Sequence, residues 1–181
     1  MSRAAGGSAA GHTEHGDDMD DRISDRTAIQ ELKASYFRFL DTKQWDQWRQ
    51  LFTDDLVFTN DDSALPTDAA PMVTGGDAFV AMVSSALGTS VTVHQGHMPE
   101  ITFVGADEAR GIWAMFDWVH DIDSESSMQG FGHYHERYVR GDDGRWRIAD
   151  LRLTRLRVDT VAATAPGGER PWPSPWQPPT A

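Results

Sequence analysis

The chain has 181 residues, a formal net charge of −12 and no cysteine. This length predicts a single domain, and the negative charge disfavours binding to nucleic-acid phosphates or anionic lipid. Disulfides and thiolate chemistry are excluded. No apolar run approaches the roughly 20 residues of a membrane span, and no apolar signal-peptide core is visible. We therefore expect a cytoplasmic protein.

The two ends of the chain differ in composition from its middle. Residues 1–22 are rich in Gly, Ala, Ser, His and Asp. With so little to bury, they are expected to be disordered. Residues 161–181 hold two tryptophans between prolines. Because proline removes backbone donors, we expect an irregular tail. The folded domain is then expected over residues 23–160.

Helical periodicity dominates the first part of this domain. Apolar side chains from Ile29 to Leu40 recur at close to helical spacing, and Asp25 can cap that helix. The following elements are expected to be a short helix around Trp45 to Phe52, a strand at 55–59, a polar loop at 60–74 and a helix at 78–87.

Long strands follow after Gly88. We expect them at 90–96, 99–105, 108–120, 128–140 and 145–158. Helices followed by a meander of antiparallel strands predict an α+β fold. The strand at 108–120 is apolar on both faces, whereas a strand with one face in water alternates with polar residues. One face should therefore meet the helices and the other a second subunit, which predicts a homo-oligomer, either dimer or trimer.

Three residues of the helix and the first long strand are candidates for acid–base chemistry. Tyr36 lies on the buried stripe of the first helix, and Asp41 lies near its end. Five residues apart, they share no helix face, so they meet only if the helix ends near Asp41. His94 alternates with two valines and would face an enclosed space in a curved sheet. Each also has a purely structural interpretation, as a core tyrosine, a turn residue and a sheet histidine.

The later strands carry further polar candidates. Asp117 interrupts an apolar strand face, where a carboxylate is costly unless it is paired. Arg155 and Arg157 are expected to share a face, and one of them could stabilise a developing negative charge. His133 and His135 form an H-x-H pair, a possible metal site. A metal needs a third and a fourth ligand, for which His94, Asp117 and Glu136 are candidates, but Glu136 would point to the other face, so we expect no metal.

Nucleotide-driven chemistry and serine hydrolysis are not indicated. The sequence has no Walker loop, no G-x-G-x-x-G and no G-x-S-x-G.

Several stretches together resemble the nuclear transport factor 2-like superfamily, in particular its SnoaL-like and scytalone-dehydratase-like branch. They are Tyr36-Phe-Arg-Phe-Leu-Asp41, Trp45-Asp-Gln-Trp-Arg-Gln-Leu-Phe-Thr-Asp-Asp55, His94 and Gly144-Arg-Trp-Arg-Ile-Ala-Asp-Leu-Arg152. The resemblance covers about residues 22–160. It implies a cone-shaped, curved antiparallel sheet with three to four helices enclosing an apolar cavity.

Similar proteins include bile-acid and scytalone dehydratases, hexachlorocyclohexane dehydrochlorinase, polyketide cyclases and ketosteroid isomerases. The resemblance implies that a helix Asp supports a strand His that removes a proton. We therefore expect a cofactor-independent lyase that eliminates from a small apolar ring-containing substrate. The expected catalytic residues are Tyr36, Asp41, His94, Asp117 and Arg157. The expected substrate contacts are Phe39, Trp113, Met115, Phe131 and His133.

Alternatives remain open at this point. The same base could serve an isomerase or a cyclase, and the same fold could serve a non-catalytic ligand-binding or assembly subunit. His97 could replace His94, and Arg155 could replace Arg157.

Overall fold

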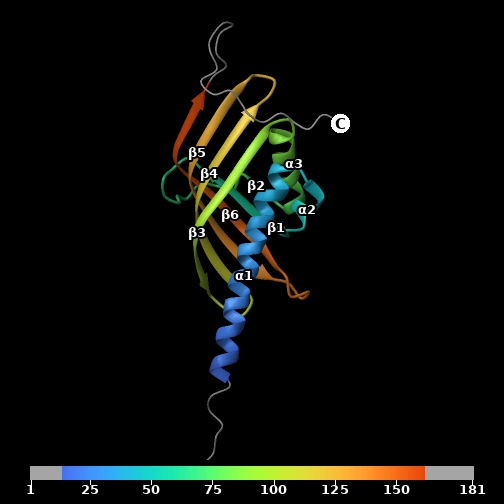
Figure 1. Ribbon diagram of the computed structural model, residues 1–181, viewed down its shortest axis with the longest axis vertical. Helices are drawn as coiled ribbons and strands as arrows, with labels where there is room; N and C mark the ends of the chain where they lie inside the picture. The colour runs from blue at the N-terminus through green and yellow to red at the C-terminus, as the bar shows by residue number, and fades with distance from the viewer. Residues whose placement is uncertain (1–13, 162–181) are drawn as a thin grey trace, which may run out of the picture.

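A computed structural model describes residues 14–161, with side chains from residue 21 onward (Figure 1). The helices are α1 (Glu14–Asp41), α2 (Trp45–Arg49) and α3 (Gly76–Leu87). The strands are β1 (Phe52–Asp61), β2 (Val73–Thr74), β3 (Val91–Phe103), β4 (Glu108–Asp121), β5 (Ser126–Arg140) and β6 (Trp146–Val161). None of the helices in this part of the chain is both long and apolar enough to cross a membrane. The tail expected at 161–181 lies, apart from its first residue, outside the described residues.

The strands form one sheet in the order β2-β1-β6-β5-β4-β3. β3 to β6 make an antiparallel meander, whereas β1 pairs with β6 in parallel. The predicted α+β class is confirmed. The two strands expected at 90–96 and 99–105 are one strand, β3, with an irregularity between His97 and Glu100. Met98 has φ +40° there and precedes a proline, which explains why the sequence predicted two separate strands.

Helix α1 begins earlier than the sequence indicated. It starts at Glu14, so residues 14–22, expected to be disordered, are helical. Once a helix has nucleated, each added residue gains a hydrogen bond without a new nucleation cost. Asp25 is inside the helix and does not cap it. Its carboxylate accepts hydrogen bonds from Trp146 Nε1 at 3.1 Å and Arg140 Nη2 at 2.7 Å. This pairing anchors α1 to β5 and β6.

The helices lie over one face of the curved sheet, which we call the covered face; the opposite side is the outer face (Figure 1). Strand alternation sorts the side chains between them. On β4, Trp113, Met115 and Asp117 point to the covered face and are buried, while Ile112 on the outer face is exposed. Trp48, at the centre of the core, contacts several aromatic rings of neighbouring elements, including Phe52 and Phe79.

An irregularity in β6 decides which arginine reaches the covered face. Gly132 pairs with Arg155, but its neighbour Phe131 pairs with Arg157, so Leu156 is an extra residue. A bulge of this kind reverses the alternation beyond it. Arg155 therefore points to the covered face and Arg157 to the outer face, and the expectation that they share a face is wrong.

Candidate functional site

The site begins where helix α1 ends. Asp41 is its last residue, and the chain then turns through Lys43, whose φ is +58°. Because the helix stops there, the Asp41 side chain reaches β3. Its Oδ1 lies 2.7 Å from His94 Nδ1, and its Oδ2 accepts a hydrogen bond from the His94 backbone N–H at 2.9 Å. The predicted contact between Asp41 and His94 is present.

This geometry fixes the chemistry of the imidazole ring. A carboxylate next to Nδ1 favours the tautomer in which Nδ1 carries the proton. Nε2 is then left with its lone pair. None of the described residues hydrogen-bonds to Nε2, although His94 is only 8% exposed. The pair thus has the arrangement of a general base with its orienting carboxylate.

Two further side chains support Asp41. The Thr92 hydroxyl donates to Asp41 Oδ1 at 2.9 Å and accepts a hydrogen bond from Lys43 Nζ at 2.9 Å. Burial lowers the pKa of Lys43, and the nearby Asp41 charge opposes that shift. Asp41 therefore accepts three hydrogen bonds, which hold its carboxylate in one orientation.

Next to His94 on β4 lies Asp117, its direct register partner. Asp117 is buried and makes a two-pronged ion pair with Arg155, from Nη1 to Oδ1 at 2.9 Å and from Nη2 to Oδ2 at 2.8 Å. Arg157, the residue expected in the site, instead lies exposed and pairs with Asp159 at 2.7 Å. The structure brings Arg155, not Arg157, to Asp117, the register partner of His94.

Tyr36 lies in the same buried layer but is not bonded to the dyad. Its ring packs against Phe37, Trp48, Phe52 and Tyr134. No described residue hydrogen-bonds to its hydroxyl. Burial raises the pKa of Tyr36 well above its ordinary value, with smaller contributions from nearby acidic groups. Its hydroxyl therefore remains a proton donor at neutral pH.

A second polar cluster, which sequence reasoning missed, lies beneath these residues. Lys33 and Glu136 form a fully buried ion pair, and Glu136 also accepts a hydrogen bond from the Tyr138 hydroxyl. That hydroxyl in turn accepts one from Trp113 Nε1 at 2.8 Å. Burial lowers the pKa of Lys33, and Glu136 opposes the shift. The sequence feature that could have indicated a buried Lys33 is its spacing, since Lys33 lies on the same helix face as Ile29 and Tyr36.

Lys33 also connects this cluster to the tyrosines. Its Nζ lies 4.0 Å from the Tyr36 ring centroid and 3.7 Å from that of Tyr134, within cation–π range. Burial is the main cause that raises the pKa of Tyr134 as well.

The expected substrate contacts divide between the two faces. Trp113 and Met115 lie on the covered face, in line with Asp117. Phe131 and His133 do not, because they pair with the outer-face residues Phe116 and Ala114. The structure thus contradicts the expectation for these two. Alternation alone could not reveal which of two largely apolar faces the helices cover.

Phe39 and His97 also lie away from the dyad. Phe39 lines a surface groove together with Leu51 and Trp146, and neither Asp41 nor His94 lines that groove. His97 is exposed and pairs with Ala114 on the outer face, so it is not a substitute for His94. Among residues 14–161, no group of three or more metal-ligating side chains is assembled, and the H-x-H pair faces away from His94 and Asp117.

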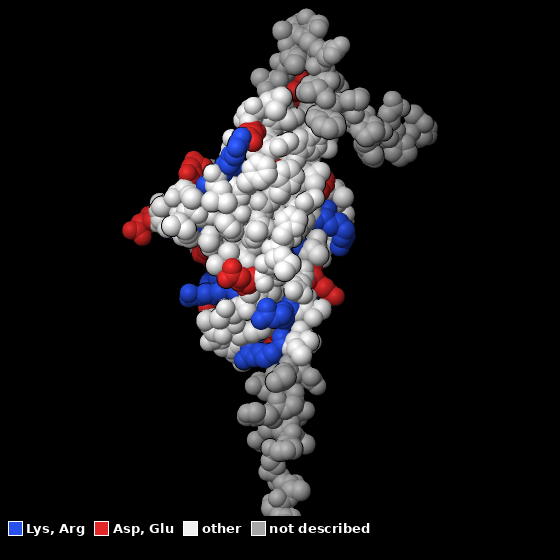
Figure 2. Space-filling view, turned by 60° about the vertical axis from the view of Figure 1, so that its left-hand side comes forward, with Lys and Arg blue, Asp and Glu red and all other residues white. Residues whose placement is uncertain are grey.

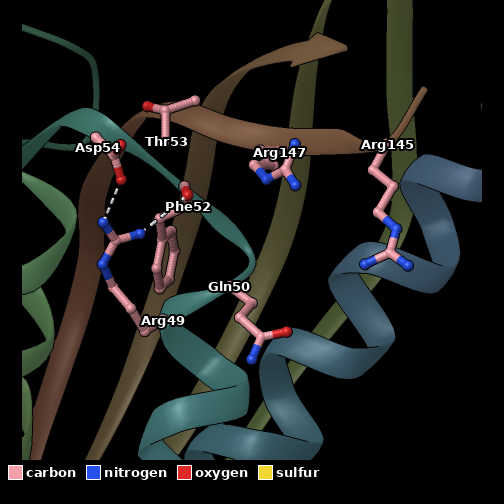
Figure 3. Close-up of a pocket in the computed structure, with 7 residues that line it drawn as sticks. All are labelled: Arg49, Gln50, Phe52, Thr53, Asp54, Arg145 and Arg147. Carbon is pink, nitrogen blue, oxygen red and sulfur yellow. Dashed lines mark hydrogen bonds and ion pairs between the residues drawn. The ribbon is translucent and has the colours of Figure 1, made fainter. Parts of the chain in front are cut away.

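A separate polar hollow of about 380 Å³ lies near the start of β1 and β6 (Figure 3). Its lining includes Arg49, Arg145 and Arg147. Arg49 is already paired with Asp54, and Arg147 with Asp143. The hollow shares no residue with the dyad, so the chemistry described above is not located there.

The chain belongs to the SnoaL-like domain family, whose model matches residues 21–152. A probable cyclase, FGR4, of Gibberella zeae is 30% identical over 135 residues, which cover 71% of this chain and 89% of the relative.

Solved structures share the fold. A type 2 hexachlorocyclohexane dehydrochlorinase, LinA, superposes with a TM-score of 0.67 at 22% identity, over 81% of this chain and 97% of its own. A scytalone dehydratase-like protein of Novosphingobium aromaticivorans gives a TM-score of 0.66 at 22% identity, over 84% and 99%. These likenesses show that the fold is shared, and the SnoaL-like family expected from the sequence is confirmed by the family model.

Proposed function

We propose that this SnoaL-like protein is a cofactor-independent lyase that eliminates water or a similar leaving group from a small, neutral, ring-containing substrate. The observation that carries the proposal is the 2.7 Å contact between Asp41 Oδ1 and His94 Nδ1, which leaves Nε2 free as a base. General-base catalysis by a positioned histidine typically contributes about 10²–10⁴ in rate.

In the proposed reaction, His94 Nε2 takes a proton from a substrate carbon. The electron pair of that C–H bond forms the new double bond as the leaving group departs with its own pair. Asp41 stabilises the imidazolium that forms. Arg155, or the neutral hydroxyl of Tyr36, donates hydrogen bonds to the departing group. A departing hydroxide takes a proton from the imidazolium directly, or from Tyr36, which then recovers its proton from the imidazolium, so that water leaves and both residues return to their neutral forms.

The charges near the dyad favour a neutral substrate. Arg155 is neutralised by Asp117, and Lys33 by Glu136. Because each cation already has a carboxylate partner, its attraction for a substrate with a permanent negative charge is weakened. Buried ions already paired in this way are costly to separate. With Trp113 and Met115 on the same face, the surroundings suit an apolar ring whose negative charge develops only during reaction.

A cyclase acting through the same base is the second candidate. The observation that favours it is the 30% identity with the probable cyclase of Gibberella zeae. Removing a proton beside a carbonyl gives an enolate, which can attack a second carbonyl instead of expelling a leaving group. The two reactions share His94 and Asp41 and differ in substrate.

We also propose that the protein is a homo-oligomer formed through the outer face. Val91 is 45% exposed and Val93 39% exposed, and Phe116, Trp118 and Phe131 beside them are only half-buried. Exposed apolar patches of this kind mark interaction surfaces. Figure 2 shows a broad area without charged side chains across the middle of the molecule.

The proposed reaction is tested with hexachlorocyclohexane and scytalone as first substrates, following chloride release and loss of water. We expect His94→Ala and Asp41→Asn to lower the rate by about 10²–10⁴, because either change removes the oriented base. His97→Ala is the matched control and should leave the rate unchanged, since His97 is exposed on the outer face. Full elimination activity in both dyad variants would refute the proposal.

A further inference from the structure

Arg155 reaches Asp117 by crossing a whole strand. Arg155 lies on β6 and Asp117 on β4, and β5 runs between them. The guanidinium nevertheless makes two hydrogen bonds to the carboxylate, at 2.9 and 2.8 Å. Such a contact between strands that are not neighbours requires that the intervening strand presents no side chain at that point.

Gly130 provides this gap. It is the direct register partner of Asp117 on β5. A Cβ at position 130 would lie 1.9 Å from Arg155 Nη1 and 2.1 Å from Asp117 Oδ1. The ion pair therefore occupies the volume that any other side chain would fill. Gly130 is not among the described glycines with positive φ, so the backbone does not require glycine here. Glycine is required here because the side chains of Arg155 and Asp117 fill the space above it.

The ion pair lies directly beside the proposed base. Asp117 is the register partner of His94, and both side chains point to the covered face. Both Asp117 oxygens accept a hydrogen bond from the guanidinium, so each oxygen of the carboxylate already has a partner. The planar guanidinium carries five N–H groups, and two of them donate hydrogen bonds to Asp117. Another points toward Met115 Sδ at 3.8 Å, which leaves further donors for a ligand.

We propose that Gly130 and Asp117 are positioning residues, which hold the Arg155 guanidinium over β5 and against Asp117, the register partner of His94, so that it stabilises negative charge developing on the substrate. This inference rests on the proposed function, because it takes His94 as the place where that charge arises. It gives Asp117 the task of orienting Arg155 and not that of a second acid or base.

Gly130→Ala tests this directly, because it removes no functional group. The atoms that an added Cβ would meet are the ends of two flexible side chains, not backbone. The strand can therefore keep its fold while the guanidinium moves. Asp117→Glu is a second variant that keeps both charges and displaces the carboxylate by one methylene. Gly105→Ala is the matched control, since its Cβ would meet nothing within 4 Å.

The readout is the ionisation of bound 4-nitrophenol, a neutral ring whose anion absorbs visible light and imitates a developing oxyanion. In the wild type, we expect binding to increase the ionised fraction, and Arg155→Met to abolish the increase. Gly130→Ala and Asp117→Glu should each reduce the ionisation constant of the bound phenol about tenfold, the order expected for a lost charge-assisted hydrogen bond. Gly105→Ala should match the wild type. Circular dichroism confirms that each variant is folded.

The outcomes separate the inference from the proposed function. Wild-type protein that does not bind 4-nitrophenol, or an ionisation that Arg155→Met leaves unchanged, would count against the proposed charge-stabilising site itself. A second outcome would overturn the inference: Arg155→Met abolishes the increased ionisation of bound 4-nitrophenol, but folded Gly130→Ala and Asp117→Glu retain it in full. Arg155 would then stabilise the anion without needing Gly130 or Asp117 to position it.

Discussion

Asp41 occupies a position where a carboxylate is normally unfavourable. It is the last residue of α1, and the C-terminal end of a helix carries partial negative charge. The Thr92 hydroxyl and two nitrogens of His94 compensate by donating to or facing its oxygens. The carboxylate that faces Nδ1 of His94 is therefore carried by the end of the helix itself. That arrangement suits a base that must become positively charged when it takes a proton.

Arg155 shows how a single extra residue changes a functional assignment. Sequence alternation placed Arg155 and Arg157 on one face, and the bulge at Leu156 separates them. A bulge is difficult to predict from one sequence, because it is defined by the pairing of two strands and not by the residues of one strand alone. Gly130 and Gly132 on β5 were the available signal, because glycine inside a strand often marks a bulge or a close approach.

At the scale of elements, every tyrosine of the chain is buried, either on α1 or on the strand β5 of the covered face. Tyr36 lies on α1, and Tyr134 and Tyr138 lie on β5. The chain contains three tyrosines in all, and each is less than 5% exposed. Burial is the largest cause that raises the pKa of all three above the ordinary value. Folded protein therefore keeps these hydroxyls protonated where unfolded protein would lose the protons.

This predicts a steep loss of stability in alkaline solution. Above about pH 10 the unfolded chain releases three tyrosine protons that the folded chain retains, so the free energy of unfolding falls as pH rises, by about 4 kcal/mol per pH unit. The pKa of Lys33 is lowered in the folded state, so Lys33 makes the free energy of unfolding rise with pH. This contribution ends at about pH 10.5, where Lys33 of the unfolded chain also loses its proton.

The measurement is near-ultraviolet absorbance of tyrosinate during an alkaline titration, together with circular dichroism. Tyrosinate should appear only as the protein unfolds, in one cooperative step. Gradual ionisation of one or more tyrosines while the dichroism stays native would show that the interface between α1 and β5 is open to water.

At the scale of the whole molecule, the periodicity of the chain was sufficient to predict the fold class and most elements. The helix ending at Asp41 and the long strands of the meander are confirmed. The parallel pairing of β1 with β6 was not predicted, because it joins residues nearly 100 positions apart and no local pattern records it. Phe131 and His133 were assigned to the wrong face for a different reason, because alternation does not reveal which of two largely apolar faces the helices cover.

The candidate site was predictable in part. The contact of Asp41 with His94 followed from the resemblance together with the helix end. The buried pair of Lys33 with Glu136 did not, because a charged residue on a core stripe is usually solvated at the edge of the stripe and seldom fully buried. Only the packed structure shows that the two charges meet.

The proposed oligomer belongs to the same scale. Light scattering after size-exclusion chromatography should give a mass of two or three chains. Phe116→Asp on the outer face should shift the protein toward the monomer, since a charge placed in a buried apolar interface is costly. A wild-type protein that is monomeric at all concentrations would contradict the proposed interface.

The central claim is that Asp41 holds His94 as a base with a free Nε2. The most direct measurement is nitrogen-15 NMR of histidine-labelled protein, in which His94→Gln identifies the signals of that ring among the seven histidines. For the neutral ring, our account predicts a proton on Nδ1 and a bare Nε2, with no substrate needed. A neutral ring that carries its proton on Nε2 would contradict this arrangement, because the nitrogen facing Asp41 would then have no proton with which to donate a hydrogen bond to the carboxylate.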